Sequence, residues 1–167
     1  MSRRKPEPPR KRSSAFVPFP TYDELDRRLA DAVRTIVNQH ELDIESLPKS
    51  IAVVSGVIGE GVTTVARTLS LLIAHEMGAS ACLVDCSWMS DTSTPSTEAE
   101  PVGMYELMTE RCTIYDALRP TGGESKLMSL GPGNLPANRR HVLARSAQFE
   151  RLIDLLSDEL DHVVFDT

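Results

Sequence analysis

The chain has 167 residues, of which 41% are hydrophobic and 25% are charged, as is ordinary for a soluble globular domain with its own core. Residues 1–12 hold six Lys/Arg and one acid, whereas the remainder holds 12 basic and 23 acidic side chains, a net charge of −11. This acidic remainder argues against nucleic acid as a partner. No run approaches the ~18–20 apolar residues of a membrane span, and three cysteines without a signal peptide indicate reduced thiols and a cytoplasmic location.

Residues 1–20 are rich in Pro, Arg, Lys and Ser, a composition typical of a disordered arm, and residues 21–167 form the expected domain. Two interpretations of the arm stay open. One is a solvated tail. The other is an electrostatic contact of residues 3–12 with anionic lipid headgroups at the inner face of the cell membrane, or with another acidic surface.

Helical and strand patterns alternate along the rest of the chain. The pattern predicts an α/β fold with an open, mainly parallel sheet and helices on both faces. Nine helices and strands are expected, six of them before residue 120 and three after it. In order, they are a helix at 21–40 capped by Thr21 and Glu24, a buried strand at 51–54, a helix at 63–75, a strand at 81–86, short helices at 104–108 and 114–118, a strand at 127–130, a helix capped by Ser146, and a strand at 163–165, with a polar loop at 87–102.

A glycine-rich turn between the first strand and the second helix resembles a phosphate-binding loop. Gly56 and Gly61 occupy the glycine positions of GxxxxGK[ST], and Thr63 occupies the hydroxyl position. Val62 stands where the motif has lysine. Backbone N–H groups of the turn and of the helix start would bind phosphate. The spacing does not fit the dinucleotide motif GxGxxG. The predicted nucleotide-binding residues are Gly56, Gly59, Glu60, Gly61, Val62, Thr63 and Thr64.

Asp85 and Asp166 each end a predicted strand. Ligands of open α/β sheets collect outside the carboxyl ends of the strands, so these carboxylates, with the Thr63 hydroxyl, are the predicted Mg²⁺ ligands. Asp85 is also the predicted catalytic residue if the protein is active. The alternative is that each acid only caps a strand end or a turn.

The missing lysine has an energetic consequence. A charged hydrogen bond contributes roughly 1.5–3 kcal/mol, so its loss would weaken a nucleotide site by about 10- to 100-fold or more. ATP and Mg²⁺ binding are therefore expected to be weakened. Arg67 lies one helical turn beyond Thr63 and could reach back, but we expect it to be a solvated surface residue.

Several ordered segments resemble one family. Ile51-Ala-Val-Val-Ser55 with Gly59-Glu60-Gly61, Leu83-Val-Asp85, Asp31-Ala-Val-Arg34-Thr and Asp161-His-Val-Val-Phe-Asp166-Thr167 are similar to motifs of bacterial tyrosine kinases of the polysaccharide co-polymerase type, the CpsD/CapB group of the MinD/ParA-like P-loop ATPases. The resemblance implies a P-loop NTPase-like domain that binds ATP and Mg²⁺. It also implies a membrane polysaccharide co-polymerase or other export protein as partner, and a homo-oligomer contact through the segment at Asp31.

The sequence differs from the family at positions within the family's functional motifs. Lysine is replaced by Val62, proline by Ile58, and the second acid of an Asp-x-Asp motif by Ser87. The sequence also stops before the family's later strands and tyrosine-rich tail, which predicts an incomplete domain, truncated at its C-terminal end, and an unpaired edge at residues 51–54.

Three hypotheses follow from these motifs and departures. The first is a degenerate relative that acts as a partner or regulator in exopolysaccharide or capsule biosynthesis or export. The second is an active ATP-dependent tyrosine kinase that autophosphorylates on Tyr22, Tyr105 or Tyr115. The third is a positioning ATPase of the MinD/ParA kind.

Overall fold

A single five-stranded sheet forms the centre of the computed structural model, which describes residues 19–44, 46–57, 59–86, 102–121 and 123–167. The strand order is β1-β5-β2-β4-β3, and every pair is parallel except β3 with β4. This confirms the predicted open, mainly parallel sheet. The strands are β1 Ser50–Val53, β2 Ala81–Asp85, β3 Arg119–Thr121, β4 Glu124–Leu130 and β5 His162–Asp166.

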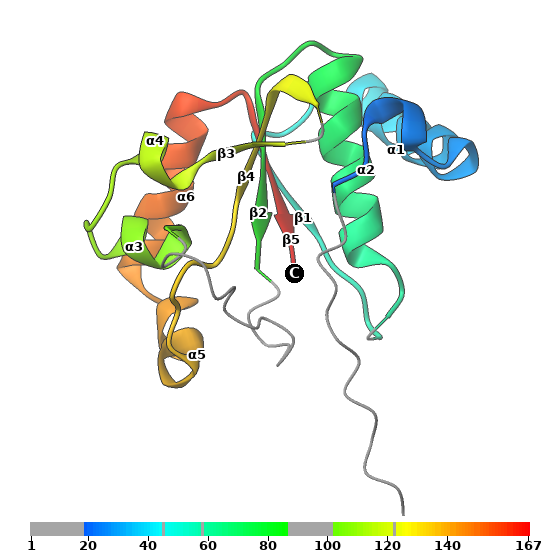
Figure 1. Cartoon of the computed structure of the whole chain (residues 1–167). Coiled ribbons are helices and arrows are strands. Elements are labelled where there is room, and N and C mark those ends of the chain that lie inside the picture. Colours follow the sequence, from blue (N-terminus) through cyan, green and yellow to red (C-terminus); the bar gives the residue numbers. More distant parts are fainter. Residues whose placement is uncertain (1–18, 45, 58, 87–101, 122) are drawn as a thin grey trace, which may run out of the picture.

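Helices cover both faces of this sheet, as predicted (Figure 1). α1 and α2 lie on one face, and α3, α4 and α6 lie on the other. None of the helices in the described residues combines the length and the apolar character needed to span a bilayer. The helical elements are η1 Tyr22–Glu24, α1 Arg27–Ile44, α2 Val62–His75, α3 Met104–Met108, α4 Ile114–Ala117, η2 Ala137–Arg139, α5 Arg140–Leu143 and α6 Ala147–Glu159.

The core is divided by the sheet into two apolar layers. Leu83 and Val164 point into the layer under α2, whereas Val84 and Val163 point into the layer under α6. All four are buried, because successive side chains of a strand alternate between the two faces. The short apolar runs of β2 and β5 therefore occupy the centre of the sheet.

The N-terminal helix differs from its predicted form. The predicted cap forms, because the Thr21 N–H donates to Glu24 Oε2 over 2.8 Å. It caps only the short 3₁₀ turn η1 and not the long helix. α1 begins later, where Asp26 Oδ1 accepts from the N–H of Leu29 over 3.0 Å. The backbone of Leu25 is extended, which separates the two elements.

A polar cluster fastens η1 and α1 to the C-terminal end of α2. Arg34 Nη2 lies 2.6 Å from Glu76 Oε1, and the Tyr22 hydroxyl donates to the same carboxylate. The hydrogen bonds from Arg34 lower the pKa of Glu76. Tyr22 also stacks on His75, with ring centroids 3.7 Å apart. The cluster thereby fixes the chain segment that directly follows Phe19.

β1 is the least buried parallel strand. Within the described residues it pairs only with β5, which confirms the predicted unpaired edge. The prediction of a buried strand is wrong, because Ser50 and Ala52 are exposed and only Ile51 and Val53 are half-buried against the α2 layer.

Three short elements were not predicted. β3 contains Pro120, which tolerates an edge position but conceals the strand in the sequence. η2 and α5 are too short to show helical periodicity. The basic arm as far as residue 18, Ile58, and the loop from Ser87 to residue 101 lie outside the described residues.

Close backbone packing joins α3 to the turn after β4. The N–H of Met104 donates to the carbonyl of Gly131 over 2.8 Å, and the N–H of Gly103 donates to Glu106 Oε2 over 3.0 Å. A Cβ on Gly103 would lie 2.6 Å from both the Gly131 carbonyl oxygen and the Gly133 nitrogen. Both are main-chain atoms, so no side-chain movement relieves the clash.

We predict that Gly103→Ala lowers the free energy of unfolding by about 1–3 kcal/mol, as overpacking does elsewhere. Urea denaturation measures the change. Gly131→Ala is the matched control, because nothing lies within 4 Å of its Cβ position. Equal stabilities of the two variants would contradict this account of the turn.

Candidate functional site

The glycine-rich loop joins the edge strand β1 to the start of α2. Gly59 and Gly61 have φ values of 92° and 88°, which residues with a Cβ rarely adopt. Gly61 is the N-cap of α2 in the left-handed conformation, and its carbonyl accepts from the N–H of Val65 over 3.0 Å. The first N–H groups of α2 therefore have no helical partner and face the loop, as in an anion site.

The motif residues lie in the loop and in the first turn of α2, which begins at Val62, one residue earlier than predicted. Gly56, Gly59 and Glu60 are exposed in the loop, and Thr63 and Thr64 are exposed in the first turn of α2. Val62 is the first residue of α2, and its side chain is half-buried. The loop thus keeps its backbone form, while the side chain at the lysine position carries no charge.

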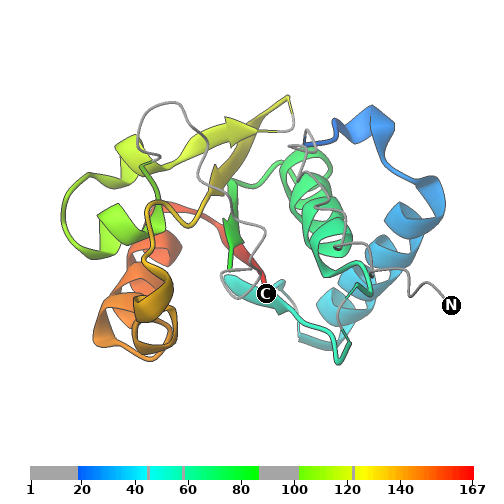
Figure 2. The ribbon, with the colours of Figure 1, turned by 60° about the horizontal axis from the view of Figure 1, so that its bottom comes forward.

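The structure also brings the two predicted acids together. Asp85 and Asp166 are register partners at the carboxyl ends of β2 and β5. The Thr63 hydroxyl donates to Asp166 Oδ1 over 3.1 Å, which joins α2 to β5. Both views place the end of β5 between α2 and α6 (Figures 1 and 2). Thr63, Asp85 and Asp166 therefore lie together beside the carboxyl ends of β2 and β5.

Burial controls the chemistry of Asp166, which is only 5% exposed. Burial raises the pKa of this carboxyl, and the negative charge of Asp85 acts in the same direction. The hydrogen bond from Thr63 and the positive charge of Arg67 act in the opposite direction. A bound cation would relieve the cost of holding this carboxylate in its ionised form.

A cavity of about 220 Å³, with both polar and apolar lining residues, adjoins the two acids. Arg67 lines this cavity, and its guanidinium carbon lies 5.4 Å from the ring centroid of Phe19. Because the residue is half-buried, the expectation that it is a solvated surface residue is wrong. The sequence placed Phe19 in the arm, and only the spacing of Arg67 from Thr63 hinted at this cavity. The lining residues are Phe19, Arg67, Leu83, Asp85, Thr121, Ser129, Leu130, Gly131 and Asp166.

The donor set fits Mg²⁺ shared with phosphates better than a metal held by protein alone. Among the described residues, no group of three or more His, Cys, Asp or Glu side chains is arranged to hold a metal ion. Mg²⁺ typically uses one or two carboxylates together with phosphate oxygens and waters. The carboxylates of Asp85 and Asp166 with the Thr63 hydroxyl match that pattern.

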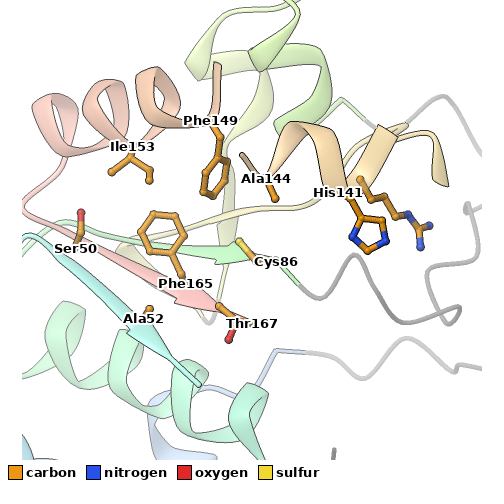
Figure 3. Close-up of a pocket in the computed structure, with 10 residues that line it drawn as sticks. Ser50, Ala52, Cys86, His141, Ala144, Phe149, Ile153, Phe165 and Thr167 are labelled. Atoms are coloured by element: carbon orange, nitrogen blue, oxygen red, sulfur yellow. The ribbon is translucent and has the colours of Figure 1, made fainter. Parts of the chain in front are cut away.

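A second cavity, of about 470 Å³, lies on the opposite face of the sheet, between β1, β5, α5 and α6 (Figure 3). Phe149, Ile153 and Phe165 point into it. Burial raises the pKa of the Cys86 thiol in its wall to about 12, so this sulfur stays protonated. The apolar lining suits packing rather than catalysis.

Comparison with solved structures identifies the fold. The kinase domain of the Escherichia coli tyrosine kinase ETK matches with a TM-score of 0.68 at 18% identity, over 83% of this chain and 54% of that chain. The chimerical protein CapA2B2 matches with a TM-score of 0.67 at 25% identity, over 82% and 60% of the two chains. The septum site-determining protein MinD from Pyrococcus horikoshii OT3, complexed with Mg-ADP, matches with a TM-score of 0.53 at 23% identity, over 72% and 49%.

These neighbours confirm the P-loop NTPase-like α/β fold, and they include tyrosine kinase domains and MinD-like ATPases, the two groups that the sequence resembles. The chain spans 54–60% of the lengths of the ETK and CapA2B2 chains. No protein-family model and no curated protein matches it.

The raised pKa of Asp166 yields a prediction about stability. A group whose pKa is higher in the folded state stabilises the protein below its unfolded pKa, about 3.9, and this contribution is lost as pH rises through the folded value. We therefore predict that Asp166→Asn unfolds at a higher temperature than wild type at pH 7. The difference should shrink as pH falls towards 4.

Asp161→Asn is a control of opposite sign. The N–H and hydroxyl of Ser80 donate to Asp161 Oδ2 and hold the pKa of that carboxyl below its usual range. Its contribution is present above the unfolded pKa and is lost as pH falls through the folded value, so this variant should be less stable than wild type at pH 7. Lower stability of Asp166→Asn at pH 7 would show that ionised Asp166 is not a strained group.

Proposed function

We propose that this chain is a degenerate P-loop kinase-like protein of exopolysaccharide or capsule biosynthesis or export, which acts as a partner or regulator of a membrane co-polymerase. The observation that carries the proposal is Val62, an uncharged side chain at the lysine position of a loop in which Gly59 and Gly61 have positive φ. Nucleotide binding is weakened in such a site, and phosphoryl transfer is weakened more, because the lysine also stabilises the charge of the transition state.

The partner role draws its support from two sources. The sequence motifs resemble kinases of polysaccharide co-polymerase systems, and the structural neighbours include the kinase domains named above. A protein that has lost a catalytic charge but kept its fold retains its surfaces for binding other proteins. The basic arm is then suited to an acidic surface at the membrane.

A titration of ATP with Mg²⁺ tests the proposal. We predict that wild type binds more weakly than Val62→Lys by about 10- to 100-fold, because the variant restores one or two charged hydrogen bonds to phosphate. Isothermal titration calorimetry measures both affinities.

Asn38→Lys is the matched control, because it adds the same charge at an exposed position on α1, outside the glycine-rich loop and α2. Micromolar binding by wild type, with no gain in Val62→Lys, would contradict the proposal.

An active tyrosine kinase is the second candidate, and the contact between Thr63 and Asp166 beside Asp85 favours it. A MinD-like positioning ATPase draws on the same residues and on the similarity to MinD. Both candidates require productive binding of ATP and Mg²⁺.

Side-chain exposure distinguishes the possible acceptor tyrosines of the kinase candidate. Tyr115 is 77% exposed on α4, whereas Tyr105 is 9% exposed and Tyr22 is half-buried. If the protein autophosphorylates, mass spectrometry should locate phosphate on Tyr115 among these three. Tyr115→Phe should remove that signal and Tyr105→Phe should leave it. Phosphate on Tyr105 would mean that the α3 region opens in the reacting protein.

A further inference from the structure

We propose that Arg67 supplies the positive charge that is missing at Val62, by binding the terminal phosphate of a Mg²⁺–nucleotide held on the glycine-rich loop. The inference rests on the proposed function in one respect, because it requires the retained loop to bind nucleotide, however weakly. It adds a residue that the phosphate-loop motif does not contain.

The position of Arg67 on α2 directs it to the site. It follows Thr63 by four residues, so the two side chains leave neighbouring turns on one side of the helix. Thr63 bonds Asp166, and Arg67 lines the same cavity as Asp85 and Asp166. The effect of the Arg67 charge on the pKa of Asp166 is consistent with this proximity.

The guanidinium of Arg67 has unused binding capacity. None of the ion pairs formed within the described residues involves it. Its Nε is buried and has no hydrogen-bond partner there. A buried donor of this kind is costly to leave unpaired, and a phosphate oxygen is a natural acceptor for a guanidinium. The free donor therefore points to an anion as the missing partner.

Phe19 holds the guanidinium without occupying its donors. The ring centroid lies 5.4 Å from the guanidinium carbon. A cation–π contact engages no N–H donor in a conventional hydrogen bond, so the donors stay available for a bidentate contact to phosphate. Phe19 is thus a positioning residue, and the cluster around Tyr22 and Glu76 keeps it in place.

The charges of the cavity explain why the ligand is a metal–phosphate pair rather than a simple anion. Asp85 and Asp166 would repel a free phosphate from Arg67. Mg²⁺ bound to these carboxylates would remove the repulsion, and the phosphate would then contact both Mg²⁺ and Arg67. ATP with Mg²⁺ is accordingly the probe, and inorganic phosphate without metal should bind no better to wild type than to Arg67→Gln.

The experiment measures ATP·Mg²⁺ affinity by calorimetry in two backgrounds. We expect Arg67→Gln to weaken binding about 10-fold or more, both in the wild-type chain and in Val62→Lys, where affinity is higher and easily measured. Arg67→Lys should recover part of the loss. Arg28→Gln, an exposed arginine on α1, is the charge-matched control and should bind like its parent.

The outcomes separate this inference from the proposed function. If Val62→Lys binds ATP·Mg²⁺ and adding Arg67→Gln changes nothing, the role of Arg67 is refuted while the degenerate-loop proposal stands. If Val62→Lys does not bind, the proposed loop function fails and the inference fails with it. A lower melting temperature of Arg67→Gln with unchanged affinity would show that Arg67 only packs against Phe19, which also refutes the inference.

Discussion

The hydrogen bond from Thr63 to Asp166 is the constraint on which the site depends. It fastens the first turn of α2 to the end of the central strand β5, so the loop before α2 must reach the carboxyl ends of the strands. Gly61 completes this geometry by entering α2 in the left-handed conformation. The loop is therefore shaped by contacts that do not involve a lysine, which explains how a valine at position 62 leaves the backbone form intact.

The sequence is sufficient to predict the parts of the fold that repeat a simple pattern. The apolar runs at β2 and β5 and the amphipathic α2 and α6 give the layers, and the acids after β2 and β5 meet because parallel strands end at one edge. Exposure of β1 depends on which strands flank it, which local pattern does not encode. Phe19 and Arg67 meet only because distant contacts at Glu76 fix the N-terminal segment, so sequence spacing alone missed their cavity.

The two faces of the sheet support different roles. The edge at Asp85 and Asp166 brings together two carboxylates, the Thr63 hydroxyl and one arginine, and the proposed metal–nucleotide ligand would bind there. The opposite cavity beside β1 is apolar and holds a thiol that burial keeps protonated. The first set of groups suits a charged ligand, whereas the second cavity suits apolar packing.

A crystal structure of Val62→Lys with Mg²⁺ and a non-hydrolysable ATP analogue tests the central claim most directly. The account predicts that Gly59 and Gly61 keep their positive φ, that the phosphates lie on the N–H groups at the start of α2, and that Thr63 and Asp166 stay adjacent. A loop that refolds to admit the ligand, or a nucleotide bound elsewhere, would contradict the claim that valine replaced the lysine in a loop that is already shaped for phosphate.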